Sequence, residues 1–258
     1  MRVVTVGTGT VVPDPERASA CLWIEVGAER AVIDCGAGAL RAMARADLPW
    51  GELGHLFLSH FHNDHLNDVP ALVFALRHAL AVPRTRPLRI AGPVGTRGLF
   101  ERWAAALGEW LLHADFPISV AELTPEDVVP LGDASVRVHP TPHTDESVAY
   151  RVDGPDGSLG YTGDTGASEA LAEFLAGVDL LVAECSLPDD RAIDHHLTPS
   201  RLARLARRAR PGRLAVTHIY PQLRGQDLPA LLRAADYDGP VVVAEDGMEF
   251  RPRRGRAG

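Results

Sequence analysis

Short apolar runs alternate with polar turns along most of the chain, and this pattern predicts many strands. Runs rich in Val, Ile and Leu, bounded by Gly, Pro, Asp or Asn, are typical of strands buried on one or both faces. We expect strands near residues 2–7, 20–26, 31–34, 55–59, 88–91, 134–139, 148–152, 158–162, 179–184, 213–217 and 241–244. Helical periodicity predicts helices near 37–46, 68–81, 96–112, 167–176, 199–209 and 227–235.

The segment 199–209 carries the clearest helix signals. Thr198 can cap its start, and Pro199 suits the first helical position. The apolar face consists of Leu202, Leu205, Ala206 and Ala209. The opposite face carries Arg201, Arg204, Arg207 and Arg208. We interpret these arginines as a solvent-facing surface rather than a nucleic-acid-binding patch.

The number of expected strands bears on the fold class. The 258 residues are 46% apolar and 23% charged, which is ordinary for a globular protein. More strands are expected than a simple alternating βαβ fold needs, so two β-sheets flanked by helices fit better. No linker or low-complexity segment divides the chain. We therefore expect one α/β domain over residues 1–250 and a frayed basic tail over residues 251–258.

Charge and cysteine content bear on the binding partners and the cellular compartment of the protein. A net charge of −8 argues against extensive nucleic-acid binding, which needs a basic face. The three cysteines, Cys21, Cys35 and Cys185, form no CxxC pair and suit a reducing compartment. The chain opens on an expected strand without a signal-peptide pattern, and no apolar stretch is long enough to span a membrane. We expect a soluble cytoplasmic protein with no membrane partner.

The densest polar segment is SHFHNDHLND at residues 59–68, just where an apolar strand ends. It contains His60, His62, Asp64 and His65. Imidazole and carboxylate groups are ligands that zinc and similar divalent ions favour. Offsets of two, two and one put these side chains on neither one helix face nor one strand face. We therefore expect a loop that folds back, aiming His60 and His62 at one ion and Asp64 and His65 at a second.

This segment resembles the His-x-His-x-Asp-His signature of the metallo-β-lactamase-fold hydrolases. Further stretches resemble the same family in the same order, namely VGTGTVVPDPERASACLWIE, AVIDCGAGALRAM, TPHTDESVAYRV, GYTGDTGASEAL and LAVTHIYP. The last three supply His143, Asp164 and His218. The resemblance covers most of the chain. It implies an αββα four-layer sandwich, with two mixed β-sheets flanked by helices and a two-metal site on their rim.

The resemblance also implies a ligand set for two divalent ions, with zinc preferred and manganese or iron as alternatives. One ion is expected on His60, His62 and His143, and the other on Asp64, His65 and His218. Asp164 is expected to bridge them, because two ions ~3.5–4 Å apart can clamp both reacting oxygens of a hydrolysed bond. We count Asp64 among the catalytic residues as well, and expect Asp34 to orient the histidine loop.

One further histidine is a candidate catalytic acid. The segment HHLTPSRLARLA resembles the His-x-Thr stretch of the ribonuclease Z-like branch, in which a histidine just before this helix faces the scissile group. His196 fits that place, and His195 beside it is the alternative. An imidazole has a usual pKa near ~6.5, so it can protonate a leaving alkoxide at neutral pH.

Only twenty residues separate His143 from Asp164. The tRNA-processing members usually carry a long basic arm in this interval, so its absence disfavours tRNA as a substrate. We therefore expect a metal-dependent hydrolase of a small phosphodiester, and leave open a homodimer. The alternatives are a ribonuclease Z-like RNA-processing endonuclease and a lactone or ester hydrolase.

Two remote alternatives on the same fold are a redox protein and a carrier. The diiron electron-transfer branch usually has Glu in place of the second histidine of the motif, and here that residue is His62. An intact set of seven ligands also speaks against a carrier.

Overall fold

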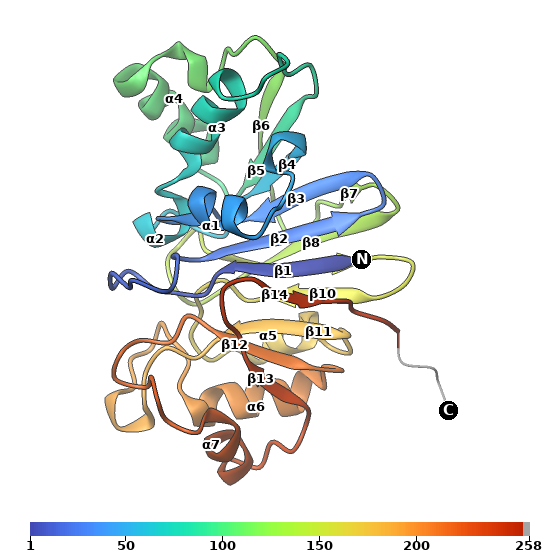
Figure 1. Cartoon of the computed structure of the whole chain (residues 1–258). Helices are drawn as coiled ribbons and strands as arrows, with labels where there is room; N and C mark the ends of the chain where they lie inside the picture. The colour runs from blue at the N-terminus through green and yellow to red at the C-terminus, as the bar shows by residue number, and fades with distance from the viewer. Residues whose placement is uncertain (255–258) are drawn as a thin grey trace.

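In the computed structural model, two seven-stranded β-sheets pack face to face with helices on both outer sides (Figure 1). The structure describes residues 1–254. The first sheet has the order β14-β1-β2-β3-β4-β5-β6, and its strands are Met248–Phe250, Arg2–Gly7, Cys21–Val26, Glu29–Ile33, His55–Phe57, Leu88–Gly92 and Ile118–Glu122. The second has the order β13-β12-β11-β10-β9-β8-β7, and its strands are Val241–Val243, Leu214–Thr217, Leu180–Glu184, Ser158–Tyr161, Val148–Asp153, Ala134–Pro140 and Val129–Leu131.

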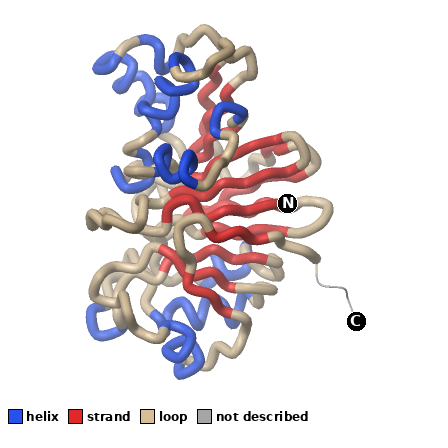
Figure 2. The backbone as a smooth tube through the Cα atoms, in the orientation of Figure 1, coloured by secondary structure: helices blue, strands red, loops and turns tan. Residues whose placement is uncertain are grey.

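The helices cover the outer faces of the two sheets, and the strands form the central block of Figure 2. The first sheet is covered by α1 (Ala39–Arg45), α3 (Val69–His78) and α4 (Thr96–Leu107). The second is covered by α5 (Glu169–Phe174), α6 (Pro199–Ala209) and α7 (Leu228–Ala234). A short helix α2 (Asn63–Leu66) and three 3-10 turns, Trp50–Glu52, Glu109–Leu111 and Asp189–Arg191, complete the described elements.

Three apolar cores hold these layers together. In β2, Leu22 and Ile24 face the core between the sheets, whereas Trp23 between them faces the helices of the first sheet. In β11, Val182 likewise faces the central core and Leu181 faces α5 and α6. Successive residues of a strand point to opposite faces, so strands that are apolar on both faces must be covered on both. The expected αββα sandwich is confirmed.

Several elements differ from the expectation. The sequence pattern did not predict the strands β6, β7 and β14. Of these, β7 and β14 have only three residues each, and β6 is a half-exposed edge strand. The helix expected over 96–112 ends at Leu107, because Gly108 adopts a φ of 126° that stops helical hydrogen bonding. The histidine segment is also not wholly a loop, since Asp64 and His65 lie in α2.

The strand ends place the polar segments at one edge of the sandwich. The parallel strands β3 and β4 end just before Asp34 and the segment 58–62, and β10 and β12 end just before Asp164 and His218. Parallel strands bring their carboxyl ends to the same edge of a sheet, where ligands commonly bind. In Figure 1 this edge, marked by α2, lies opposite the N-terminus.

The C-terminal segment is described only up to Arg254. The backbone N–H of Arg254 donates to the carbonyl of Asp156 at 2.7 Å, and Pro252 is buried. The rest of the expected frayed tail, residues 255–258, lies outside the described residues. A single domain over residues 1–250 remains our proposal, supported by the core that both sheets share. Among the described helices, none has the length and apolar character that a membrane span requires.

We predict that Tyr150→Phe destabilises the fold. The buried hydroxyl of Tyr150 in the second sheet donates to the carbonyl of Leu58 in the first at 2.6 Å, so its removal leaves that carbonyl without this donor. The expected loss is ~1–3 kcal/mol of unfolding free energy, measured by urea denaturation. Tyr237→Phe is the matched control, because that buried hydroxyl has no hydrogen-bond partner in the described chain. Equal effects of the two substitutions would contradict the proposed role of the Tyr150 bond.

Candidate metal centre

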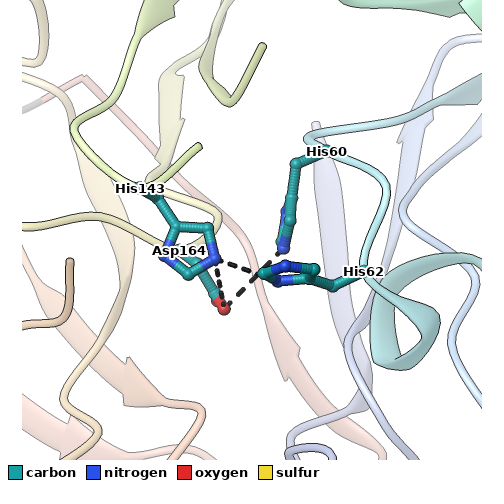
Figure 3. A group of neighbouring side chains, drawn as sticks. All are labelled: His60, His62, His143 and Asp164. Atoms are coloured by element: carbon teal, nitrogen blue, oxygen red, sulfur yellow. Dashed lines mark hydrogen bonds and ion pairs between the residues drawn. The ribbon is translucent and has the colours of Figure 1, made fainter. Parts of the chain in front are cut away.

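Side chains from both sheets converge at this edge into two adjoining groups of metal-ligating atoms. The first group is His60, His62, His143 and Asp164, whose donor atoms all lie within 4.8 Å of one another. The second is Asp64, His65 and His218, with the same spacing. Figure 3 shows the first group, with the rings of His60, His62 and His143 turned toward the carboxylate of Asp164. The structure thus brings together all seven expected ligands.

The carboxylate of Asp164 lies between the two groups, with one oxygen toward each. Its Oδ2 is 3.9 Å from His60 Nε2 and 3.6 Å from His143 Nε2. Its Oδ1 is 3.3 Å from His65 Nε2 and 3.5 Å from His218 Nε2. A carboxylate that presents its two oxygens to separate donor groups has the geometry of a bridging ligand.

The remaining contacts define each group further. In the first group, His143 Nε2 is 3.1 Å from His62 Nδ1. In the second, Asp64 Oδ2 is 3.2 Å from His218 Nε2 and 4.0 Å from His65 Nε2. The assignment of one ion to each group remains our proposal, and this geometry supports it.

Asp34 orients the histidine segment, as expected. It is fully buried and adopts a φ of 61°, a left-handed conformation that few residues other than glycine adopt. Its carboxylate accepts from the backbone N–H of Ser59 at 2.7 Å and from the hydroxyl of Tyr161 at 2.9 Å. It also accepts from Nδ1 of His65 at 2.7 Å, so Nε2 of that ring faces the centre. Such carboxylate–histidine pairs fix the orientation of a metal-binding ring.

Three other histidines are held through Nδ1 in the same way. The partners are the hydroxyl of Ser59 for His60 at 3.0 Å, the carbonyl of His195 for His143 at 2.9 Å, and the hydroxyl of Ser186 for His218 at 3.1 Å. Each contact leaves Nε2 directed at the centre. The exposed side chain of His195 takes no part in these contacts; its backbone does.

Three buried atoms at the centre lack a hydrogen-bond partner in residues 1–254. They are Nε2 of His60, Nε2 of His65 and Oδ1 of Asp164. An unsatisfied buried polar atom costs ~1–3 kcal/mol, so three of them at one point would be a considerable penalty. Divalent cations bound at the two groups would satisfy all three, because imidazole nitrogens and carboxylate oxygens are ligands of zinc, manganese and iron. The residues present therefore fit the metal ions that the fold implies.

Electrostatics at the centre also favour a cation. Burial and the neighbouring His65 lower the pKa of His60 far below its usual range, so its ring is neutral and its lone pair is available to a metal. Burial would raise the pKa of Asp164, but the surrounding histidines, His218 and His65 above all, lower it well below its usual value. Asp164 is therefore ionised and brings a negative charge into the buried centre.

His196 lies beside the centre and is held by a buried glutamate. Its Nδ1 donates to Oε1 of Glu184 at 2.9 Å, and the other oxygen of Glu184 accepts from the backbone N–H of Leu197 at 3.2 Å and from the hydroxyl of Ser186. Burial would lower the pKa of His196, but the hydrogen bond and charge of Glu184 outweigh it and raise the pKa. The ring thus has Nδ1 fixed and Nε2 free to act.

A pocket of about 480 Å³ opens over the centre. His62, Asp64, Asp164 and His196 line it together with Val11, Phe61, Asn63 and Tyr220. Ligand-binding sites typically range over ~300–1,000 Å³, so this space accepts a group of nucleotide size. Three of the proposed ligands, the proposed acid and a substrate would therefore share one cavity.

Sequence reasoning missed the residues that position the ligands. Ser59 and Ser186 are ordinary polar residues in the sequence, and nothing marks their hydroxyls as histidine partners. Glu184 could have been recognised from the sequence, because it is a charged residue that ends the apolar run Leu-Leu-Val-Ala of β11. A fully buried charge at a strand end calls for partners, but the sequence does not say which ones.

The comparisons with known proteins agree with this architecture. A family model described as the beta-lactamase superfamily domain matches residues 29–219, which include all seven proposed ligands. The chain belongs to this superfamily. Its relatives place it in the ribonuclease Z-like branch: a protein named Ribonuclease Z from Mycobacterium tuberculosis is 30% identical over 279 residues, covering 98% of this chain and 100% of the relative. The protein is therefore a metallo-β-lactamase-fold hydrolase.

Solved structures of this superfamily confirm the fold. The metallo-β-lactamase-fold protein YhfI from Bacillus subtilis superposes with a TM-score of 0.84 at 22% identity, covering 96% of this chain and 98% of that one. The short form of human tRNase Z superposes with a TM-score of 0.78 at 23% identity, covering 98% of this chain and 99% of that one.

The comparisons also correct the expected partners. We expected a small phosphodiester or ester substrate and little nucleic-acid binding, and this expectation is wrong, because relatives that match over their full length are named Ribonuclease Z. The expectation rested on the short interval between His143 and Asp164 and on the net charge of −8, which averages over the whole surface. A local basic surface can bind a polyanion on a protein that is acidic overall.

We predict that the purified protein holds close to two divalent ions per chain. The two groups of donor atoms and the unsatisfied atoms at their centre are the physical reason. Elemental analysis after expression with added zinc or manganese measures the content. Asp164→Ala should lower it, because both groups lose a ligand, whereas Asp145→Ala, at an exposed residue near His143, should leave it unchanged. Wild-type protein without metal would contradict the two-metal proposal.

Proposed function

We propose that this protein is a metal-dependent endoribonuclease that hydrolyses a phosphodiester bond of RNA. The observation that carries the proposal is the convergence of seven metal-ligating side chains at one edge of the sandwich, under a pocket that His62, Asp64, Asp164 and His196 line. The relatives named Ribonuclease Z, which this chain matches over nearly its whole length, support RNA as the substrate. Two divalent ions bound there would polarise the phosphodiester and lower the pKa of an attacking water.

The residues of the chain would then divide the remaining work. Asp64 lines the pocket with one carboxylate oxygen toward His218, and it can accept a proton from the attacking water. The charge of Glu184 stabilises the protonated form of His196, so Nε2 of that ring can donate a proton to the leaving ribose oxygen. Phe61 and Val11 supply apolar surface on the pocket wall.

The role of His196 as an acid can be separated from metal binding. We expect His196→Ala to keep both metals and to slow RNA cleavage by ~10²–10⁴-fold, because a ribose alkoxide leaves poorly without a proton. Hydrolysis of bis-p-nitrophenyl phosphate should suffer much less, since p-nitrophenolate needs little protonation. His195→Ala is the matched control, because it removes an exposed ring and keeps the carbonyl that holds His143.

Two results would contradict this role for His196. Equal losses on RNA and on the activated ester would indicate charge stabilisation or structural damage. Loss of metal would make His196 a ligand, a place that its closeness to Asp164 and His218 permits.

A cleavage assay tests the proposed function itself. Metal-quantified protein is incubated with a tRNA precursor that has a 3′ extension and, separately, with bis-p-nitrophenyl phosphate. We expect an endonucleolytic cut in the RNA, and a fall of at least ~10²-fold in Asp164→Ala, the scale on which misplacing a reacting group costs rate. Hydrolysis of the ester with no cleavage of any RNA would overturn the proposal.

A further inference from the structure

A groove of about 440 Å³ runs between α5 and α6, outside the metal centre. Its floor contains Ala172 of α5 and Leu205 of α6, both buried. Its rim carries Arg201, Arg204, Arg207 and Arg208 of α6. We call this feature the arginine groove.

The charges around the arginine groove are only partly compensated. Arg201 lies 3.6 Å from Asp194 and Arg207 lies 3.3 Å from Asp236, and both aspartates are largely exposed. Surface pairs of this kind are worth ~0–1 kcal/mol, so a phosphate can displace them. Arg208 pairs with Glu173, and one further acid, Glu169, lines the groove. For Arg204, no ion pair is found within residues 1–254.

The arginines of α6 lie at positions where their charges destabilise the helix. The helix contains four arginines and no acidic residue. Arg204 and Arg208 are four residues apart, a spacing at which like charges repel on a helix surface. Arg201 lies in the first turn, where the helix dipole disfavours a cation. A solvent-facing helix would gain from mixed charges, so this pattern favours an anionic partner.

The arginine groove adjoins the metal centre along the chain. Ala167, on its wall, lies three residues after Asp164, and Arg201 donates to the backbone carbonyl of His196 at 3.2 Å. A polyanion that extends from the metal centre along the segment carrying His196 would meet this rim at Arg201.

We propose that the arginine groove binds the phosphate backbone of the RNA substrate outside the cleaved bond. This proposal rests on the proposed action on RNA, but it concerns a separate surface and is tested by binding alone. Arg204 and Arg207 supply the charge, and Arg201 links the groove to the segment that carries His196. This proposal revises our interpretation of the α6 arginines as a merely solvent-facing surface.

The experiment measures the affinity of the metal-loaded protein for fluorescently labelled tRNA by anisotropy, over a series of salt concentrations. We expect Arg204→Glu to weaken binding by about tenfold, as expected for one lost charge-assisted contact. Arg204→Gln should reduce the salt slope by about one. Arg233→Glu on α7 is the matched control, because Arg233 is exposed and does not line the groove.

Melting temperatures show that each variant is folded before its affinity is compared. Unchanged affinity and salt slope in both Arg204 variants, or a wild-type protein that does not bind tRNA, would overturn the proposal. Equal, Arg204-dependent binding of poly-glutamate would assign the groove to acidic peptides instead. If the protein binds RNA in an Arg204-dependent way but does not cleave it, the proposed function is wrong and the proposal for the arginine groove stands.

Discussion

The structure depends on one constraint: ionised and neutral polar groups must be buried together where the two sheets meet. Asp34 and Asp164 are almost completely buried, and so are His60 and His65. Taking a carboxylate out of water is costly unless hydrogen bonds, charges or metals compensate for it. Asp34 achieves this with donors from Ser59, the histidine segment and the second sheet. Asp164 does so only in part, because its Oδ1 finds no hydrogen bond in the described chain, and a cation would compensate for this missing partner.

Backbone strain accompanies this arrangement. Asp34 and His218, at the ends of β3 and β12, adopt φ values of 61° and 53°. Left-handed conformations of such residues cost ~1–3 kcal/mol and persist only where the surroundings enforce them. Here they turn the chain sharply at a strand end, so that a side chain faces the rim instead of following the pleat. The strain and the unsatisfied atoms occur at the same edge. Functional sites are where features that destabilise the fold are expected to be retained.

The sequence was sufficient for the layers and for the residues that converge at the proposed metal centre, but not for the residues that hold them in place. The apolar runs predicted most strands, and the motif around His60 with its family context predicted which distant residues would meet it. Strands such as β14 have three residues, too few for a periodic signal, and their pairing depends on the partner strand. The bond between Glu184 and His196 joins residues on a strand and in the loop before α6, and only the tertiary packing decides that they touch. The α6 arginines were visible in the sequence, but the groove beneath them was not.

The division of the ligands between the sheets has a consequence for the stability of the molecule. His60, His62, Asp64 and His65 follow β4 of the first sheet, whereas His143, Asp164 and His218 follow strands of the second. Ions bound between them would therefore join the two halves of the sandwich, and an unfolded chain offers no such cage. Each bound ion would add stability that grows with the logarithm of its free concentration above its dissociation constant, about 2.7 kcal/mol at a hundredfold excess. Metal binding at this centre would thereby link the fold of the protein to the metal supply of its surroundings, and scarcity of the ion would loosen the sheets as well as stop the reaction.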